Sequence, residues 1–479
     1  MRGLGEQHKS KKKKVNHKVS KLSKEQLINR AIKFHLEGNI QEASKYYQYC
    51  LDQGLNDQRI FSNYGVILKN LGKLKEAEIF YRKAIKLNPN YVDAHSNLGL
   101  ILNDLEKFEE AEISYRKAIE LNPNHANAHY NLGNILKYIG KLKEAEIYYR
   151  KAIELNPNFG DAYLNLGFIE LLKGNYKSGL EYYEFRMKTK YNQPSIPHAQ
   201  PKIDRIDQER LNKGEKILVL SEQGLGDTLQ YMRYIPYLRN EGFDISFCAQ
   251  NKLHSLIKAS GIDQNPLAPG QANSVLEGKW ISLLSLPKYL KINPSNPIIS
   301  KPYIFSTFEL KKKWNNILSK EKRPIVGINW QGNPRMEKTY KGRSIPLEIF
   351  SILLAQNDIT MLSLQKGFGS EQLDDCSFKN QFVQSQSRID STWDFLENAA
   401  IIENCDLIIT CDTSIAHLAG GMGKKVWLLL RDIPYWTWGL KEESTFWYPS
   451  MRLFRQKERH NWNEVMERVS NALLSFEVI

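Results

Sequence analysis

A tetrapeptide, Leu-Asn-Pro-Asn, recurs in the first part of this chain of 479 residues at a fixed interval of 34 residues. It occupies 87–90, 121–124 and 155–158. When the chain is aligned on this period, residues of one kind share a column, as in Gly65, Gly99, Gly133 and Gly167, in Ala43, Ala77, Ala111 and Ala145, and in Tyr47, Tyr81, Tyr115, Tyr149 and Tyr183. A regular period of this length indicates an array of similar units and not a single globular core.

Each column has a steric explanation. The small Gly and Ala residues are expected where the two helices of a hairpin approach closely. We expect the Tyr column to fill the space between neighbouring hairpins. Pro89, Pro123 and Pro157 follow the second helix of a unit and prevent its continuation. The period therefore predicts successive helical hairpins.

These columns resemble the tetratricopeptide repeat family. The resemblance implies an all-α solenoid over residues 24–193 with five units, 24–57, 58–91, 92–125, 126–159 and 160–193. The last unit departs from the family pattern, because Gly179 and Arg186 stand where Ala is usual. Divergent end units are expected where an array meets solvent or another domain.

Five asparagines also recur with the period, at the sixth position of each first helix: Asn29, Asn63, Asn97, Asn131 and Asn165. This position faces the inner, concave surface of such a solenoid. A carboxamide offers a donor and an acceptor, so a ladder of them can pair with the backbone of an extended peptide. The array resembles the peptide-binding superhelix of the protein O-GlcNAc transferases, which implies a protein or peptide acceptor on these residues. The alternative is that Asn here connects adjacent helices, as in tetratricopeptide repeats generally.

The periodicity ends near residue 193, and a polar, proline-containing linker is expected over 194–213. Strand-like apolar runs then alternate with helical stretches, at 216–220, 244–250, 324–330, 359–365, 406–412 and 425–430. Strands that alternate with helices predict parallel sheets covered by helices, an α/β region. Its length allows two such domains, 214–320 and 321–479.

Ligands of open parallel sheets bind at the carboxyl ends of the strands, and three polar segments are expected there. In the first, Gly224, Gly226 and Asp227 follow the run 216–220. The glycines permit a tight turn and close approach of a ligand. No third glycine completes a dinucleotide-binding fingerprint. Asp227 begins a helix, where it either serves a ligand or caps the helix, an effect of about 1 kcal/mol.

The second segment is the loop after 324–330, which carries four cations, Arg335, Lys338, Lys341 and Arg343. A basic loop at a strand end suits a diphosphate, and a solvated loop is the alternative.

The third segment contains Asp412, Thr413 and Ser414, where a strand ends and a helix begins. Hydroxyls and free backbone N–H groups at a helix N-terminus bind phosphate. Asp412 could hold a sugar hydroxyl, and His417, one turn later, could face the ligand. A helix cap and a structural histidine are the alternatives.

Taken together, the segments 222–234, 343–347, 412–420 and 447–456 resemble the heptosyltransferase-type glycosyltransferases. The resemblance covers 214–479 and is closest to bacterial proteins in which a tetratricopeptide array precedes such a domain. It implies the GT-B fold, two facing Rossmann-like domains of which the second binds the nucleotide sugar. It also implies an inverting hexosyl- or heptosyltransferase that needs no metal and no cofactor. Its expected donor is a nucleotide-diphosphate sugar, and its expected acceptor is a protein or glycan presented by the repeats.

The same resemblance assigns roles to residues. It implies that Asp227 is the general base that deprotonates the acceptor hydroxyl. The implied donor-binding residues are Gly224, Gly226, Lys341, Arg343, Asp412, Thr413, Ser414 and His417. Lys341 and Arg343 would neutralise the leaving diphosphate. Thr437 stands where the family often carries Arg between two tryptophans. That departure keeps open a second hypothesis, a tetratricopeptide scaffold with a catalytically degenerate nucleotide-sugar-binding domain.

Composition limits the remaining functional classes. The net charge is +14, and residues 1–24 carry nine basic side chains against Glu6 alone. Residues 1–23 are expected to form a disordered basic tail, an anionic partner being the alternative. Aromatic residues do not interleave with these lysines, so nucleic acid is not an expected partner. We expect no transmembrane segment, a cytoplasmic location, and reduced thiols at all five cysteines, because no CxxC pair occurs.

Overall fold

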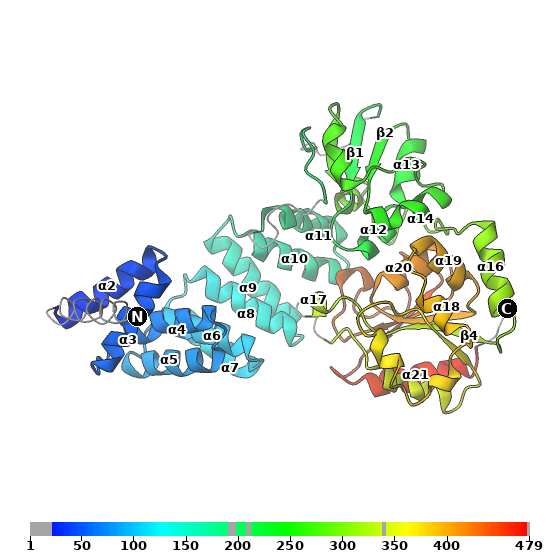
Figure 1. Ribbon diagram of the computed structural model, residues 1–479. Helices are drawn as coiled ribbons and strands as arrows, with labels where there is room; N and C mark the ends of the chain where they lie inside the picture. The colour runs from blue at the N-terminus through cyan, green and yellow to red at the C-terminus, as the bar shows by residue number, and fades with distance from the viewer. Residues whose placement is uncertain (1–21, 190–197, 207–210, 212, 338–341, 477–479) are drawn as a thin grey trace, which may run out of the picture. The chain divides into compact units, whose positions relative to one another are not determined.

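The computed structural model describes residues 22–189, 198–206, 211, 213–337 and 342–476 (Figure 1). The chain forms two compact units, residues 1–166 and 167–479. The predicted basic tail, 1–23, lies outside the described residues except for its last two, of which Ser23 caps the first helix through Gln26. No described helix has the length and apolar character needed to cross a membrane.

The first unit is all-helical, which confirms the predicted repeat (Figure 1). Its helices are α2 (Lys24–Leu36), α3 (Ile40–Asp52), α4 (Gln58–Asn70), α5 (Leu74–Leu87), α6 (Val92–Asp104), α7 (Phe108–Leu121), α8 (Ala126–Tyr138) and α9 (Leu142–Leu155), followed by α10 (Gly160–Leu172), which crosses into the second unit. Each helix buries one apolar stripe, so the core is a continuous layer between packed helices.

The Gly and Tyr columns meet within a single hairpin. A Cβ added at Gly99 would lie 2.8 Å from the ring of Tyr115, and one at Gly133 would lie 2.7 Å from the ring of Tyr149. The expectation that each Tyr fills the space between neighbouring hairpins was therefore incomplete. The ring packs against the glycine of its own hairpin, because only a residue without Cβ leaves room for it.

The second unit begins with the end of α10, then α11 (Tyr176–Tyr183) and a short 3-10 helix, η1 (Glu184–Lys188). A parallel three-stranded sheet follows in the order β2-β1-β3, with β1 (Lys216–Leu220), β2 (Asp244–Cys248) and β3 (Lys279–Ser282). The helices that accompany it are α12 (Leu225–Tyr231), α13 (Tyr234–Asn240), α14 (His254–Ala259) and α15 (Leu286–Tyr289), with η5 (Leu283–Ser285) directly after β3.

A second parallel sheet has five strands in the order β5-β4-β6-β7-β8. These are β4 (Ile325–Asn329), β5 (Thr360–Ser363), β6 (Leu407–Cys411), β7 (Val426–Leu430) and β8 (Met451–Arg455). Figure 1 shows α19 (Phe395–Glu403) and α20 (Ser414–Gly421) on one side of this sheet and α21 (Trp462–Leu473) on the other. Strands β4, β6 and β7 are buried along their whole length, as expected for a sheet covered on both faces.

The predicted parallel α/β region is thus confirmed, and all six predicted strands are present. Strands β3 and β8 were not predicted, because Lys279–Ser282 is short and half exposed at its start, and Met451–Arg455 mixes exposed and buried side chains. Part of the predicted linker also packs on the first sheet, since Arg205 pairs with Trp280 and Ala199 is buried. The helix α16 (Phe308–Leu318) contacts α19, where Trp314 donates to Glu397.

The strand orders define two sites at which ligands are expected. In an open parallel sheet the binding crevice lies where neighbouring strands are followed by connections that run in opposite directions. This point falls between β1 and β3 in the first sheet and between β4 and β6 in the second. Residues after β1 and after β6 therefore start from positions suited to binding.

Candidate functional site

Asp227 lies in the first turn of α12, directly after β1. Its Oδ2 accepts a hydrogen bond from the backbone N–H of Gly224 at 2.9 Å, so the carboxylate closes the turn that begins the helix. Burial raises the pKa of Asp227 to about 7, and the charges of Glu222 and Asp412 add to that rise, while the Gly224 N–H opposes it. A carboxylate with a pKa near neutrality can take up a proton at physiological pH.

Gly226 lies against the helix α20. A Cβ at Gly226 would be 2.8 Å from Cδ2 of His417 and 3.5 Å from Cα of Ser414. The glycine therefore lets α12 approach α20 closely, and this contact brings the turn after β1 next to the segment after β6. The resemblance implied donor binding for Gly226, and the structure gives it this packing contact.

His417 is buried inside that contact, with 8% of its surface exposed. Its Nδ1 lies 2.9 Å from the Tyr448 hydroxyl, and its ring stacks on Trp438 with a centroid distance of 5.2 Å. Burial, together with the charge of Arg233, lowers the pKa of His417 to about 3. The imidazole is therefore neutral at pH 7 and can orient a ligand but not serve there as a cation.

The segment after β6 forms the N-terminus of α20. Thr413 caps the helix by accepting from the backbone N–H of Ile415 at 3.3 Å, and its hydroxyl donates to Asn329 at 2.7 Å. Asn329 ends β4, so this bond ties together the two strands beside the crevice of the second sheet. Asp412 and Ser414 flank Thr413 and are partly exposed. Burial raises the pKa of Asp412, and Arg343 opposes that rise.

Arg343 reaches the same place from the basic loop. Its Nη2 would lie 2.6 Å from a Cβ at Gly332, and a methyl carbon of Thr413 lies 3.4 Å from the same point. The buried Nε of Arg343 has no hydrogen-bond partner among the residues that the structure describes. Lys338 and Lys341 lie outside the described residues, so only Arg343 represents the predicted pair of diphosphate-binding cations, Lys341 and Arg343.

After β7, the buried polar side-chain atoms without a hydrogen-bond partner in the described part of the chain include the indole N–H groups of Trp436 and Trp447 and the hydroxyl of Thr437. Thr437 is only 3% exposed and belongs to the 3-10 helix η9 (Trp436–Trp438). Buried polar groups are seldom left unpaired, so a cluster of them beside Trp438 and His417 is suited to a ligand rich in hydroxyls.

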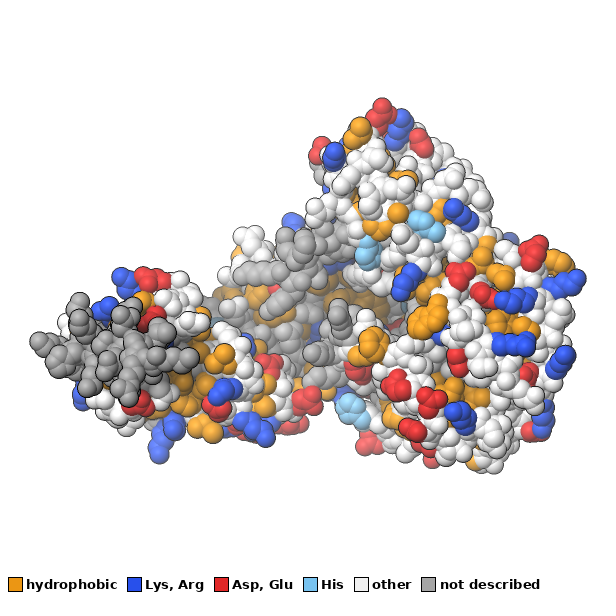
Figure 2. Space-filling model, in the orientation of Figure 1, with side chains coloured by type: hydrophobic (Ala, Val, Ile, Leu, Met, Phe, Trp, Pro, Cys, Tyr) orange, Lys and Arg blue, Asp and Glu red, His pale blue; other side chains and the backbone are white. Residues whose placement is uncertain are grey.

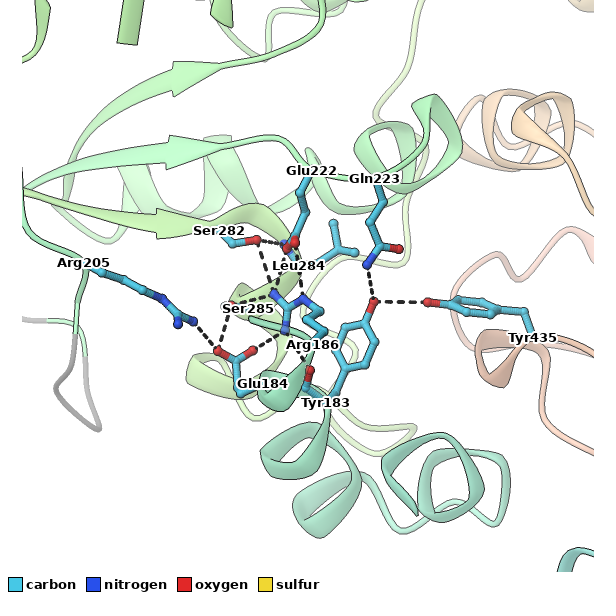
Figure 3. Close-up of polar contacts among 10 residues, drawn as sticks. All are labelled: Tyr183, Glu184, Arg186, Arg205, Glu222, Gln223, Ser282, Leu284, Ser285 and Tyr435. Atoms are coloured by element: carbon cyan, nitrogen blue, oxygen red, sulfur yellow. Dashed lines mark hydrogen bonds and ion pairs between the residues drawn. The ribbon is translucent and has the colours of Figure 1, made fainter. Parts of the chain in front are cut away.

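Two arginines that the sequence analysis did not assign to the site, Arg233 and Arg186, support this arrangement. Arg233 is buried and donates to the carbonyl of Trp447 at 2.7 Å, so it ties α12 and α13 to the segment that holds His417. Arg186, in η1, forms an ion pair with Glu222, the residue two before Gly224 (Figure 3). Arg186 could have been noticed from the sequence, because it stands where the repeat usually has Ala. Arg233 could not, because a single Arg in a sequence is usually a solvated surface charge.

The five asparagines of the repeat column lie in the first unit, and their side chains differ in the contacts that they make. Asn165 donates to Tyr130 and Asn134, at 3.3 and 3.2 Å, and its carbonyl accepts from Lys137. Its carboxamide is thus occupied by the preceding repeat, as the structural alternative predicts. Asn97 and Asn131 are half buried, and their carboxamides make no hydrogen bond with another described side chain. Asn29 is exposed beside Glu25, and Asn63 lies beside the Tyr47 hydroxyl.

The described residues hold no group of three or more His, Cys, Asp and Glu side chains able to bind a metal ion. Burial raises the pKa of the Cys248, Cys405 and Cys411 thiols to about 12, so these cysteines are protonated and unreactive at pH 7. On the face shown in Figure 2, basic and acidic side chains are interspersed over the second unit. That face therefore presents no continuous basic surface of the kind that nucleic acid requires.

Sequence comparison identifies repeats in the first part of the chain. Residues 92–125 and 126–159 match the tetratricopeptide repeat family, as do 148–181, and 65–105 match a related TPR repeat. The N-terminal region of this chain therefore consists of tetratricopeptide repeats, a class of protein-interaction scaffold. The matches extend into α11, whose hairpin partner α10 crosses between the two units.

One curated relative is Protein FlbA of Caulobacter vibrioides (strain ATCC 19089 / CIP 103742 / CB 15), 23% identical over 297 residues. The match covers 55% of this chain and 47% of FlbA, so the chain spans about half the length of that relative. Similar solved structures include MamA, with 23% identity over 33% of this chain and 92% of that chain at a TM-score of 0.31. Another is YrrB, described as a TPR protein with an unusual peptide-binding site, with 24% identity over 35% of this chain and 86% of that chain at a TM-score of 0.31. A third is PilF of Pseudomonas aeruginosa, with 21% identity over 34% of this chain and 74% of that chain at a TM-score of 0.32.

Proposed function

We propose that this chain is a glycosyltransferase that moves a sugar from a nucleotide-diphosphate sugar to a protein or peptide acceptor held by the tetratricopeptide repeats. The observation that carries the proposal is the convergence of Asp227, Asp412 and Arg343 at the carboxyl ends of parallel strands, with the pKa of Asp227 near 7. A proton acceptor, a hydroxyl-binding carboxylate and a cation for phosphate are the groups that this transfer needs.

In the proposed mechanism Asp227 removes the proton of the acceptor hydroxyl as the oxygen attacks the anomeric carbon. The bond from that carbon to the diphosphate breaks on the opposite face, so the configuration inverts. Arg343 and the N-terminus of α20 stabilise the charge that develops on the diphosphate. Asp412 and the neutral His417 orient the donor sugar, with the unpaired donors of Trp436 and Thr437 available to its hydroxyls. In this proposal the paired halves of the second unit adopt the GT-B arrangement.

A second candidate is a tetratricopeptide scaffold whose α/β unit binds a nucleotide sugar without turning it over. The observation that favours it is Thr437, which is too short and uncharged to supply the cation that the resembled family often places there. Both candidates bind a nucleotide sugar, but only the first transfers the sugar to an acceptor.

Donor binding is tested by thermal shift of the full chain against UDP-, GDP- and ADP-sugars, with a CMP-sugar as the ligand that lacks a diphosphate. At a hundredfold excess over Kd, binding stabilises the folded protein by about 2.7 kcal/mol, which raises Tm by several degrees. Arg343→Gln should abolish the shift while the unliganded Tm stays close to that of the wild type. If no nucleoside-diphosphate sugar raises Tm, the proposal is wrong.

A further inference from the structure

A side chain of η1, the 3-10 helix that follows the last helical hairpin, reaches the carboxyl ends of the strands of the first sheet. The expected ligand site of this sheet lies between β1 and β3, where Glu222 follows β1, Ser282 ends β3 and Ser285 follows it. Arg186 of η1 enters this place and is 1% exposed (Figure 3). A guanidinium of the chain itself therefore lies between the carboxyl ends of β1 and β3.

The guanidinium of Arg186 donates hydrogen bonds from all three of its nitrogens at this position. Its Nη2 donates to Glu222 at 2.7 Å and to Ser285 at 2.8 Å, and its Nη1 donates to Glu184 at 2.6 Å. Glu184 also accepts from Arg205 at 2.7 Å. Two carboxylates and two guanidiniums thus compensate one another. Arg186 and Glu222 are buried and Glu184 and Arg205 partly exposed, so removing Arg186 leaves the Glu222 charge buried without its partner.

A second connection runs from α11 to the same turn. The Tyr183 hydroxyl accepts from Nε2 of Gln223 at 3.2 Å and lies 3.1 Å from the Tyr435 hydroxyl (Figure 3). Gln223 has φ 58°, a left-handed conformation that is unfavourable for a residue with a side chain. Such a conformation persists where surrounding contacts hold it, and Tyr183 supplies one of these contacts.

The two connections meet one residue before the turn that holds Asp227. Glu222 and Gln223 are followed by Gly224, whose backbone N–H donates to the Asp227 carboxylate. A displacement of residues 222 and 223 therefore moves the donor that fixes the carboxylate.

We propose that Arg186 and Tyr183 are positioning residues for Asp227, so that α11 and η1 belong functionally to the α/β site and not only to the repeat array. The inference rests on the proposed glycosyltransferase activity and deepens it. Arg186 and Tyr183 act through Glu222 and Gln223 on the orientation of the carboxylate, and they touch neither donor nor acceptor.

Two isosteric variants of the full chain test this. Tyr183→Phe removes only the hydroxyl that holds Gln223, and Glu222→Gln removes the charge beside Asp227 while a carbonyl oxygen still accepts from Arg186. The matched control is Tyr115→Phe, which changes the same column of the repeat at an equally buried ring in the first unit. Donor Kd, kcat and the pH profile of kcat are measured for each.

We expect donor Kd within about twofold of wild type in all three variants, because none contacts the donor. Tyr183→Phe should lower kcat by about tenfold or more, since small displacements of a reacting group have large kinetic effects. Glu222→Gln should move the acid limb of the profile to lower pH, because the Glu222 charge raises the pKa of Asp227. A merely structural role would not move that limb.

Equal kcat and equal pH profiles in Tyr183→Phe, Glu222→Gln and Tyr115→Phe would overturn the positioning role, with donor turnover by the wild type intact. Failure of the wild type to bind or turn over any donor is a different result. It would overturn the proposed function, and the positioning inference with it.

Discussion

Arg186 and Glu222 form a buried ion pair, with Nη2 of the guanidinium 2.7 Å from Oε1 of the carboxylate and side-chain exposures of 1% and 0%. Arg186 belongs to the segment that follows the last helical hairpin, and Glu222 follows the first strand of the α/β region. Burial raises the pKa of Glu222, and the guanidinium of Arg186 opposes that rise. The pair joins the end of the repeat to the turn that carries Asp227.

This pair predicts a non-additive pattern in stability. Arg186→Met leaves Glu222 buried without its partner and should lower the free energy of unfolding of the second unit by about 3–5 kcal/mol. The double variant Arg186→Met/Glu222→Leu removes both charges and should lose less than the single variant. Urea unfolding of the full chain measures both. A double variant whose loss of stability relative to wild type equals the sum of the losses of Arg186→Met and Glu222→Leu would contradict the pairing.

The raised pKa of Asp227 predicts a pH-dependent gain of stability on removing its charge. In the unfolded chain the carboxyl ionises near 3.8, and in the folded chain near 7, so ionisation destabilises the folded state as pH rises between these values. Asp227→Asn should therefore be more stable than wild type by roughly 2–4 kcal/mol above pH 7 and equally stable near pH 4. The Asn carbonyl can still accept from Gly224. Equal stability at pH 8 would show that Asp227 is not held in a destabilising environment.

The close approach of α12 and α20 predicts that Gly226 tolerates no side chain. Gly226→Ala places a methyl 2.8 Å from His417, whose ring is held by Trp438 and Tyr448, and should cost about 1–3 kcal/mol. Gly270→Ala is the matched control, because no heavy atom lies within 4 Å of its Cβ position, and it should stay within about 0.5 kcal/mol. Thermal unfolding of both variants distinguishes the outcomes, and equal Tm values would refute the packing role.

The contacts of the Asn column predict different effects within one column. Asn165→Ala loses hydrogen bonds to the preceding repeat and should destabilise the array by about 1–2 kcal/mol. Asn97→Ala/Asn131→Ala should leave stability within about 0.5 kcal/mol and weaken binding of an extended acceptor peptide about tenfold. Circular dichroism melting and peptide titration separate the two. Unchanged peptide affinity in the double variant would show that these asparagines do not bind the acceptor peptide.

Much of the fold can be predicted from the 34-residue repeat and from the apolar runs in the sequence. The 34-residue period repeats the Gly99 column in four units and the Tyr115 column in all five, and the packing of Tyr against Gly then forms the hairpin. Buried strands such as Ile325–Asn329 are continuous apolar runs, so they are recognisable. Strand β8 is not, because Arg452 is exposed beside buried neighbours and the sheet decides its conformation.

The candidate site was predicted in part. Asp227, Asp412 and Thr413 lie at strand ends that sequence can locate, and the structure brings them together through the α12 and α20 contact. Arg233 and Arg186 could not be assigned from sequence, because their partners are distant in the chain and come near only when the two sheets and the last hairpin pack. Gly226 was expected to face a ligand, whereas the tertiary contact places it against His417.

If Asp227 is the base of a sugar transfer, release of nucleoside diphosphate depends on its carboxylate. The donor identified by thermal shift is incubated with wild type and with Asp227→Asn, with acceptor peptide present, and the released nucleoside diphosphate is quantified. We predict release by the wild type with a rate that rises through pH 7, and a rate at least about a hundredfold lower for Asp227→Asn at unchanged donor affinity. Equal rates for the two proteins, or donor binding by the wild type without any release, would contradict the claim.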